Sequence, residues 1–160
     1  KDGSGTYSKT KGLGEVIKEN HLTLRTSVVG PELKSDGEEL FHWFMGQSEN
    51  IAGYTKSIWS GVTTLELARA VEWSIRKGIT GIYHVTNNTS ISKYDLINLF
   101  RKHTRKDINI SAIDGEITDK SFIDTRNLLD YKIPSYDQMI YEMVELIKNN
   151  KVLYPQYHDI

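Results

Sequence analysis

The stretch YSKTKGLGEVIKENHLTLRTSVVGP, residues 7–31, decides the fold. Its first half predicts a helix that begins at Ser4 or Thr6 and runs to about Asn20. Its second half, residues 21–29, is a β-branched run of strand length that stops at a Gly-Pro pair. A helix, a short link and a buried strand form an α/β unit. In open α/β sheets, ligands bind beyond the C-terminal ends of the strands.

The rest of the chain continues with alternating strand and helix patterns. We expect strands over 51–55, 58–62, 81–86 and 108–113, and helices over 36–47, from Thr63 or Thr64 to Gly78, from Ser92 through 100, and from Ser135 through 147. The aromatic residues of 36–47 favour a core face over a base-stacking platform. The tail, 151–160, shows no periodicity.

Composition limits the classes of function. The 160 residues are 38% hydrophobic, which suits one domain, or part of a larger one, with a sizeable core. Because 20 basic and 21 acidic residues give a net charge of −1, nucleic acid and membrane surfaces are not expected partners. The absence of cysteine argues against disulfides and thiolate sites and fits the cytoplasm. The five histidines have no metal-ligand spacing, and no apolar run approaches the roughly 20 residues that span a bilayer.

Tyr7 and Lys11 form the first candidate for catalysis. Four residues apart on a helix, their side chains lie on one face and reach the same small volume. A phenol has a reference pKa of about 10, and a neighbouring ammonium lowers it by favouring the phenolate. Most such pairs are solvated helix surface, so the spacing alone leaves both interpretations open.

Three ordered blocks narrow the choice: YSKTKGLGE at 7–15, LRTSVVGP at 24–31, and GVTTLELA at 61–68 together with GIYHV at 81–85 and ISKYDL at 91–96. They resemble the active-site helix, the next strand and the C-terminal lobe of the extended short-chain dehydrogenase/reductase family, in its nucleotide-sugar branch. The likeness is closest to the dTDP-4-dehydrorhamnose reductase group, and it extends over most of residues 4–150.

The resemblance implies an α/β fold, the C-terminal part of a Rossmann-type extended fold, with parallel strands, flanking helices and a small substrate-binding lobe. Residues 1–30 would form the end of the NAD(P)-binding domain. Residues 31–160 would mainly form the substrate-binding lobe, with strand 82–86 returning to the Rossmann sheet.

The resemblance also implies roles for single residues. Tyr7 would donate a proton to the sugar carbonyl, and Lys11 would bind the nicotinamide ribose and lower the pKa of Tyr7, so both would contact the cofactor, NADP or NAD. Ser27 and Val28 would contact the nicotinamide carboxamide.

Four further residues are implied to bind the substrate: Arg25, Val29, Glu32 and Trp59. For Arg25, a strand arginine paired with a carboxylate is an equal alternative. For Trp59, core packing is the commoner role.

The family's Gly-x-x-Gly-x-x-Gly loop, which holds the dinucleotide pyrophosphate, does not occur in these residues. We therefore expect the C-terminal half of an enzyme. The implied activity is the NAD(P)-dependent reduction of a 4-keto nucleotide sugar, as in polysaccharide biosynthesis. A nucleotide-sugar epimerase, a 4,6-dehydratase and a non-catalytic regulatory subunit are alternatives. The dTDP-4-dehydrorhamnose reductase group usually has a bulky aromatic residue at the position of Val28, so the identity of the sugar stays open. An uncovered sheet edge allows a homodimer.

Overall fold

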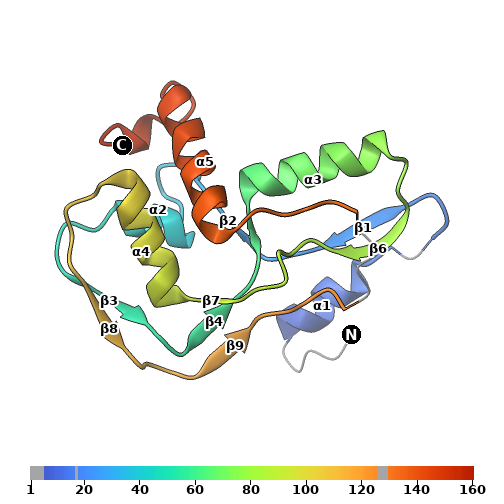
Figure 1. Ribbon diagram of the computed structural model, residues 1–160, viewed down its shortest axis with the longest axis horizontal. Helices are drawn as coiled ribbons and strands as arrows, with labels where there is room; N and C mark the ends of the chain where they lie inside the picture. The colour runs from blue at the N-terminus through green and yellow to red at the C-terminus, as the bar shows by residue number, and fades with distance from the viewer. Residues whose placement is uncertain (1–5, 17, 126–129) are drawn as a thin grey trace.

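The computed structural model describes residues 6–16, 18–125 and 130–160, with only the backbone of Tyr7 and Ser8 (Figure 1). The elements in chain order are α1 (Thr6–Leu13), β1 (Leu22–Arg25), β2 (Val28–Val29), α2 (Leu40–Met45), β3 (Ile51–Tyr54), β4 (Ser57–Trp59), β5 (Val62–Thr63), α3 (Thr64–Arg76), β6 (Gly81–His84), β7 (Ile91–Ser92), α4 (Lys93–Thr104), β8 (Ile110–Ile113), β9 (Thr118–Lys120), α5 (Tyr136–Asn149) and the 3-10 helix η1 (Pro155–Tyr157).

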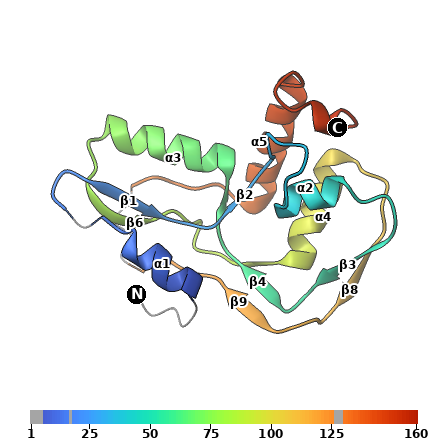
Figure 2. The ribbon, with the colours of Figure 1, turned by 180° about the vertical axis from the view of Figure 1, so that it is seen from behind.

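The strands form short sheets in which parallel pairing dominates. β1 pairs with β6, β2 with β5 and β3 with β8, all in parallel, while β4 lies between antiparallel β7 and parallel β9. In Figures 1 and 2, α3 and α1 lie on opposite sides of the β1–β6 pair, and α2, α4 and α5 gather at the other end of the molecule. The predicted α/β class, with parallel strands and flanking helices, is confirmed.

Three predicted helix starts are confirmed by their caps. The hydroxyls of Thr63, Ser92 and Ser135 accept hydrogen bonds from the backbone N–H three residues later, at 3.2, 3.0 and 3.3 Å. Each hydroxyl satisfies a backbone N–H that has no partner within the helix. These starts depend on local chemistry, which is why the sequence predicts them well.

The first predicted helix is wrong at its C-terminal end. It ends at Leu13 rather than near Asn20, and the Gly14 N–H bonds the carbonyls of Thr10 and Lys11 at 3.3 and 3.1 Å. The chain leaves the helix where Glu15 turns to meet Arg25 on β1. A Cβ at Gly14 would lie at an ordinary 3.5 Å from the Lys11 carbonyl oxygen, so no close backbone packing requires a glycine at this position.

Other boundaries also differ from the prediction. The strand expected over 21–29 is divided into β1 and β2, and the helix expected over 36–47 is reduced to α2. β9 and η1 were not predicted. Both are short, so they lack the periodicity on which prediction depends.

The core has two clusters that share helix α5. The larger one packs α2, α4 and α5 together, with the rings of Phe41, Phe44 and Phe100 completely buried. The smaller one includes Val62, Val85 and Met139 and lies against α3. The aromatic face of α2 is therefore core, as the sequence favoured.

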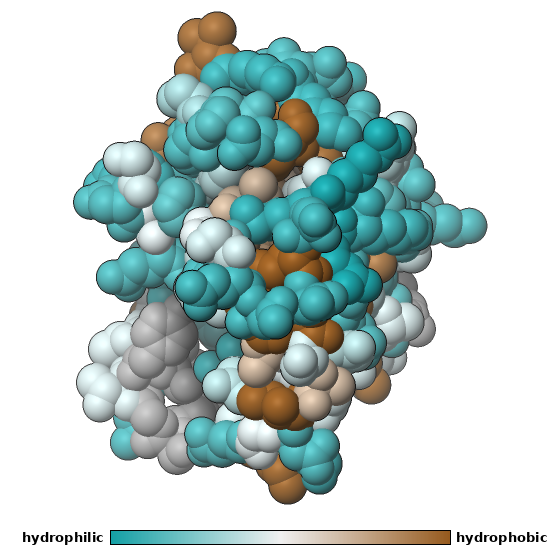
Figure 3. All heavy atoms as spheres, turned by 90° about the vertical axis from the view of Figure 1, so that its left-hand side faces the viewer, coloured by the Kyte–Doolittle hydropathy of each residue, from teal (hydrophilic) through white to brown (hydrophobic). Residues whose placement is uncertain are grey.

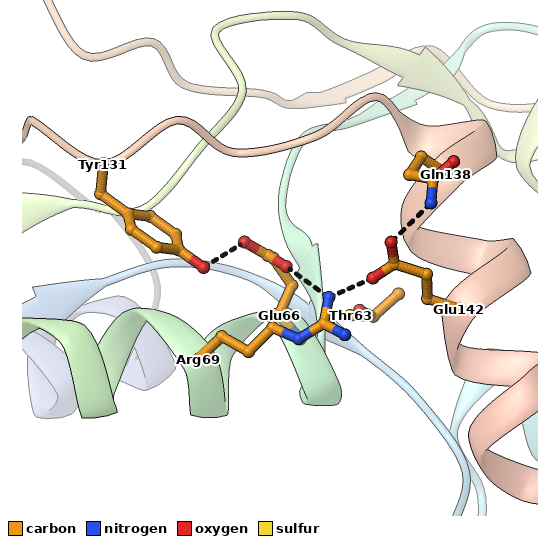
Figure 4. A network of polar contacts seen from close by, with 6 residues as sticks. All are labelled: Thr63, Glu66, Arg69, Tyr131, Gln138 and Glu142. Carbon is orange, nitrogen blue, oxygen red and sulfur yellow. Dashed lines mark hydrogen bonds and ion pairs between the residues drawn. The ribbon is translucent and has the colours of Figure 1, made fainter.

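A polar network joins α3 to α5 and to the segment before α5 (Figure 4). The carboxylate of Glu66, which is 2% exposed, accepts a hydrogen bond from the Tyr131 hydroxyl at 2.8 Å and lies 3.5 Å from Arg69. Arg69 also pairs with Glu142, whose carboxylate is bound by Gln138. Burial raises the pKa of Glu66 in spite of these partners, and it also raises the pKa of Tyr131.

The surface is mixed. Figure 3 shows hydrophobic atoms at the upper end, in the middle and at the lower end of one face, among hydrophilic side chains. Exposed apolar residues on the β3 and β8 side of the molecule include Tyr54, Ile113 and Ile117. None of the helices in the described part of the chain is long and apolar enough to cross a bilayer.

Candidate functional site

A cleft of about 540 Å³ opens where β1 ends. One wall is the segment from Thr26 to Val29, which leads from β1 into β2. The other lining residues come from the start of α2, from β4, from α4 and from β9: Glu39, Leu40, Trp59, Lys93, Leu96 and Lys120. The cleft therefore lies at the C-terminal end of a parallel strand, where ligands of α/β folds bind.

Gly61 allows two of these walls to meet. A Cβ at Gly61 would lie 2.2 Å from the carbonyl oxygen of Ser27 and 2.4 Å from the Trp59 ring. The next residue, Val62, donates its N–H to the same Ser27 carbonyl at 2.9 Å. Only glycine fits this approach, which holds the Trp59 ring against the end of β1.

Trp59 belongs to both the core and the cleft. Its ring centroid lies 5.9 Å from that of Tyr136, and it packs at the edge of both hydrophobic clusters. The remainder of the half-buried ring lines the cleft. The two roles weighed for Trp59 from sequence are thus compatible.

Two lysines that were not predicted from the sequence give the cleft positive charge. Lys120 on β9 is the direct neighbour of Trp59 in the β4–β9 pair. Lys93 is the first residue of α4, directly after its cap Ser92. Within the described residues, neither ammonium group takes part in an ion pair.

One signal in the sequence points to Lys93. Acidic side chains are favoured in the first turn of a helix and lysine is not, because the N-terminal end carries partial positive charge. A lysine directly after a serine cap is therefore a candidate for anion binding. Lys120 has no comparable signal, because its neighbour Trp59 is distant in the sequence.

Ser60 holds the strand that carries Lys120. The Ser60 hydroxyl, completely buried, accepts a hydrogen bond from the Phe122 N–H at 2.7 Å and donates to the Phe122 carbonyl at 3.0 Å. This pair of bonds fixes the chain beyond β9 against the end of β4. The spacing of Lys120 and Trp59 is thereby built into the fold.

Four of the residues predicted from sequence meet in this cleft: Ser27, Val28, Val29 and Trp59. Val29 is also a core residue and only 4% exposed, so most of its side chain packs in the larger hydrophobic cluster and little of it reaches the surface of the cleft. The direct contacts predicted for these residues with cofactor and substrate stay predictions.

The structure places Arg25 in an ion pair. Its guanidinium donates to both carboxylate oxygens of Glu15, at 2.8 and 2.6 Å, and this hydrogen bonding raises the pKa of Arg25. Such two-point pairing is the carboxylate alternative considered from sequence. Arg25 is not among the described residues that line the cleft.

Glu32, like Arg25, is not among the described residues that line the cleft. Its carboxylate accepts hydrogen bonds from the N–H groups of Glu38 and Glu39, at 3.0 and 2.9 Å, just before α2. The structure thus gives Glu32 a role in shaping the loop, and the direct substrate contact expected from sequence stays a prediction.

The predicted catalytic pair is only partly described. Tyr7 and Lys11 both belong to α1, but the side chain of Tyr7 lies outside the described residues. Lys11 is exposed and, within the described part of the chain, is not a lining residue of the cleft. The same described residues contain no group of three side chains that would hold a metal ion.

Comparison with solved structures supplies the wider context. One match is dTDP-4-dehydrorhamnose reductase from Bacillus anthracis in complex with NADP, with a TM-score of 0.68 and 19% identity over 80% of this chain and 49% of that one. Another is UDP-N-acetylglucosamine 4-epimerase from Methanobrevibacter ruminantium in complex with UDP-N-acetylmuramic acid, with a TM-score of 0.59 and 21% identity over 81% and 46%. The fold is that of the short-chain dehydrogenase/reductases.

A third match shares this short-chain dehydrogenase/reductase fold. It is dTDP-glucose 4,6-dehydratase from B. anthracis in complex with NAD, with a TM-score of 0.57 and 14% identity over 85% of this chain and 47% of that one. The chain spans about half the length of the solved structures it matches. Protein-family models and curated proteins gave no match to the sequence.

Proposed function

We propose that the chain forms the substrate-binding half of a nicotinamide-dependent enzyme that reduces the 4-keto group of a nucleotide sugar. The observation that carries the proposal is the cleft at the end of β1, which Ser27, Val28 and Trp59 line together with two lysines. Lys120 is the neighbour of Trp59 in the β4–β9 pair, and Lys93 is the first residue of α4. Two ammonium groups suit a diphosphate, and an aromatic ring suits a sugar or base.

The surroundings of Lys93 suit an elongated ligand. Lys93 also lines a neighbouring hollow with Tyr54, Ser57 and Thr118, and an apolar one with Trp43 and Gly53. We place the sugar beside Ser27 and Val28, the diphosphate near the two lysines, and the nucleoside toward Tyr54.

The described residues suit a nicotinamide dinucleotide in part. Ser27 and Val28 offer backbone and side-chain groups at the end of β1, the edge at which such cofactors bind in this fold. No glycine-rich pyrophosphate loop occurs among the 160 residues. We therefore assign that part of the cofactor site to a dinucleotide-binding half placed beside β1, and we place the complete enzyme in the cytoplasm.

In the proposed reaction the carbonyl becomes a secondary alcohol. When bound, the reduced nicotinamide supplies the hydride for the carbonyl carbon. Tyr7 donates its hydroxyl proton to the carbonyl oxygen and is then reprotonated from solvent. Lys11, one helical turn away, stabilises the phenolate that remains.

An epimerase or a 4,6-dehydratase is the second candidate, because solved structures of both kinds share the fold. In those reactions the tyrosine acts first as a base, and the nicotinamide returns to its starting state. Net consumption of NADH or NADPH therefore separates the two candidates.

The test is to assay the chain joined to its dinucleotide-binding half with a dTDP-4-keto-6-deoxy sugar and NADPH or NADH. We expect one equivalent of oxidised cofactor for each sugar reduced. Tyr7→Phe should lower kcat by about 100-fold or more, which is the usual effect of losing a general acid. Lys93→Ala and Lys120→Ala should each raise KM by about tenfold through loss of a charged hydrogen bond.

Lys148→Ala on α5, whose ammonium pairs with Glu145, is the matched control and should leave both constants unchanged. Turnover of the sugar without net cofactor oxidation would favour the epimerase or dehydratase. Full activity in Tyr7→Phe would overturn the proposed chemistry.

A further inference from the structure

The C-terminal segment inserts a tyrosine into the core of the lobe. Tyr157, in η1, is 2% exposed, and its ring lies 5.5 Å from the ring of Phe41 on α2, at an interplanar angle of 65°. The backbone N–H of Tyr157 bonds the Tyr154 carbonyl at 3.1 Å, which closes the turn. The last residues of the chain are thus part of the packing around α2.

The hydroxyl of Tyr157 holds the loop that follows β2. It accepts a hydrogen bond from the Glu32 N–H at 3.0 Å and lies 2.8 Å from Nδ1 of His42. Both bonds are satisfied together when the hydroxyl donates to Nδ1 and His42 carries its proton on Nε2. The neighbouring Gln156 amide donates to the Glu32 carbonyl, so both backbone groups of Glu32 are bound by the C-terminal segment.

Glu32 passes this restraint to the wall of the cleft. Its carboxylate accepts the N–H groups of Glu38 and Glu39, and Glu39 and Leu40 line the cleft. Removing the Tyr157 hydroxyl would leave the Glu32 N–H without its partner, while the buried ring would keep the core filled. The effect should therefore reach the cleft without loss of the fold.

We propose that Tyr157 is a positioning residue for the cleft, acting through Glu32 on the wall formed by Glu39 and Leu40. It touches neither the substrate nor the reacting atoms. The identity of the ligand rests on the proposed function, whereas the restraint itself is a property of the folded chain.

Hydrogen exchange of the 160-residue chain tests the restraint directly. In Tyr157→Phe, the amides of Glu32 and Glu39 should exchange about tenfold faster, the effect expected for a lost hydrogen bond, while amides of α3 and α5 keep their rates. Tyr154→Phe removes a hydroxyl from the same segment and is the matched control, expected to match the wild type. Unchanged exchange at both amides in Tyr157→Phe would overturn the proposal.

A second variant tests the same restraint in case Tyr157→Phe lowers the stability of the whole fold. Gln156→Leu removes the bond to the Glu32 carbonyl and leaves the buried ring in place. It should raise exchange at Glu38 and Glu39 while the urea midpoint stays near that of the wild type. An increase spread evenly over all helices would show general loosening, and it would contradict a local restraint.

Titration with dTDP connects the restraint to the cleft. Tyr157→Phe should weaken dTDP binding by about threefold to tenfold, with no change in Tyr154→Phe. Equal affinity in Tyr157→Phe and wild type, with faster exchange at Glu39, would overturn the link to the cleft. If the wild-type chain does not bind dTDP, the ligand assigned under the proposed function is wrong, and the exchange data still decide whether the restraint exists.

Discussion

At the scale of single residues, Arg25 belongs to the LRTSVVGP block that resembles the family, and the structure gives it a structural role as the ion-pair partner of Glu15. Its guanidinium is held by two hydrogen bonds to Glu15, in the chain that follows α1. The pair ties the helix of the predicted catalytic residues to β1, and so to the edge of the cleft. A phosphate-binding role for Arg25 would require this pair to open.

A double-mutant cycle of Glu15→Ala and Arg25→Ala measures that restraint. We expect a coupling free energy of about 1 kcal/mol in urea unfolding, because the pairing is two-pointed but partly exposed to solvent. Additive losses, with no coupling, would indicate that Arg25 is available to a ligand. Glu72→Ala with Arg76→Ala, an exposed pair on α3, is the control and should show weaker coupling.

At the scale of secondary-structure elements, the network of Figure 4 fixes α3 against α5 through two carboxylates with opposite titration behaviour. Burial raises the pKa of Glu66 above its ordinary 4.5. Hydrogen bonds from Gln138 and Arg69 lower that of Glu142. The first carboxylate is easier to ionise in the unfolded chain, and the second is easier to ionise in the folded one.

This difference predicts opposite pH effects for two conservative variants. As pH rises from about 4.5 through the raised pKa of Glu66, the unfolded chain gives up this proton more readily than the folded chain, so the wild type loses stability. Glu66→Gln has no such proton and should gain stability relative to wild type over this rise. For Glu142 the window lies lower: as pH rises from the lowered pKa of Glu142 to about 4.5, the wild type gains stability, so Glu142→Gln should lose stability relative to wild type over that rise. Melting temperatures measured from about pH 2 to about pH 7 cover both windows and check both variants.

The same trend in both variants would contradict the assignment of the two carboxylates. Both substitutions change a carboxylate of the same network to an amide. Effects that disturb the whole network are therefore common to both variants, and they cancel when the two are compared with each other.

The sequence predicted those elements whose signals are local. The helices capped by Thr63, Ser92 and Ser135 start where expected, because a hydroxyl and its N–H partner lie three residues apart. The end of α1 was missed, because it depends on Glu15 meeting a strand ten residues later.

The same distinction applies to the site: residues within family motifs were predicted from the sequence, and a residue placed only by strand pairing was not. Ser27, Val28 and Trp59 were found through their resemblance to family motifs, and they do meet in the cleft. Lys120 was not found, because only the pairing of β4 with β9 brings it beside Trp59. Its position is a product of tertiary structure.

At the scale of the whole molecule, β1 has one strand partner among the described residues, β6. Its other edge is where a parallel sheet would continue, and we place the dinucleotide-binding half there. As a second proposal, the same edge of β1 pairs with a second copy of the chain and forms a homodimer.

Titration calorimetry of the 160-residue chain with NADPH tests whether the pyrophosphate part of the cofactor site belongs to the proposed dinucleotide-binding half. We expect a Kd weaker than about 100 µM, because no glycine-rich loop that could bind the pyrophosphate occurs among these 160 residues. Binding of dTDP by the same preparation is the control for a folded cleft. Low-micromolar binding of NADPH would contradict the assignment of the pyrophosphate site to the dinucleotide-binding half.

The parallel pairing also has a consequence for the folding kinetics. Leu22 pairs with Gly81 and Ile51 with Ile110, each across 59 residues of chain. Contacts of such high contact order form only after long loops have closed, and this closure slows folding. The capped helices need no such closure and can form in microseconds. The rate-limiting event should therefore be the docking of β6 and β8 onto strands made much earlier in the chain, so the cleft beside β1 takes shape among the last parts of the molecule.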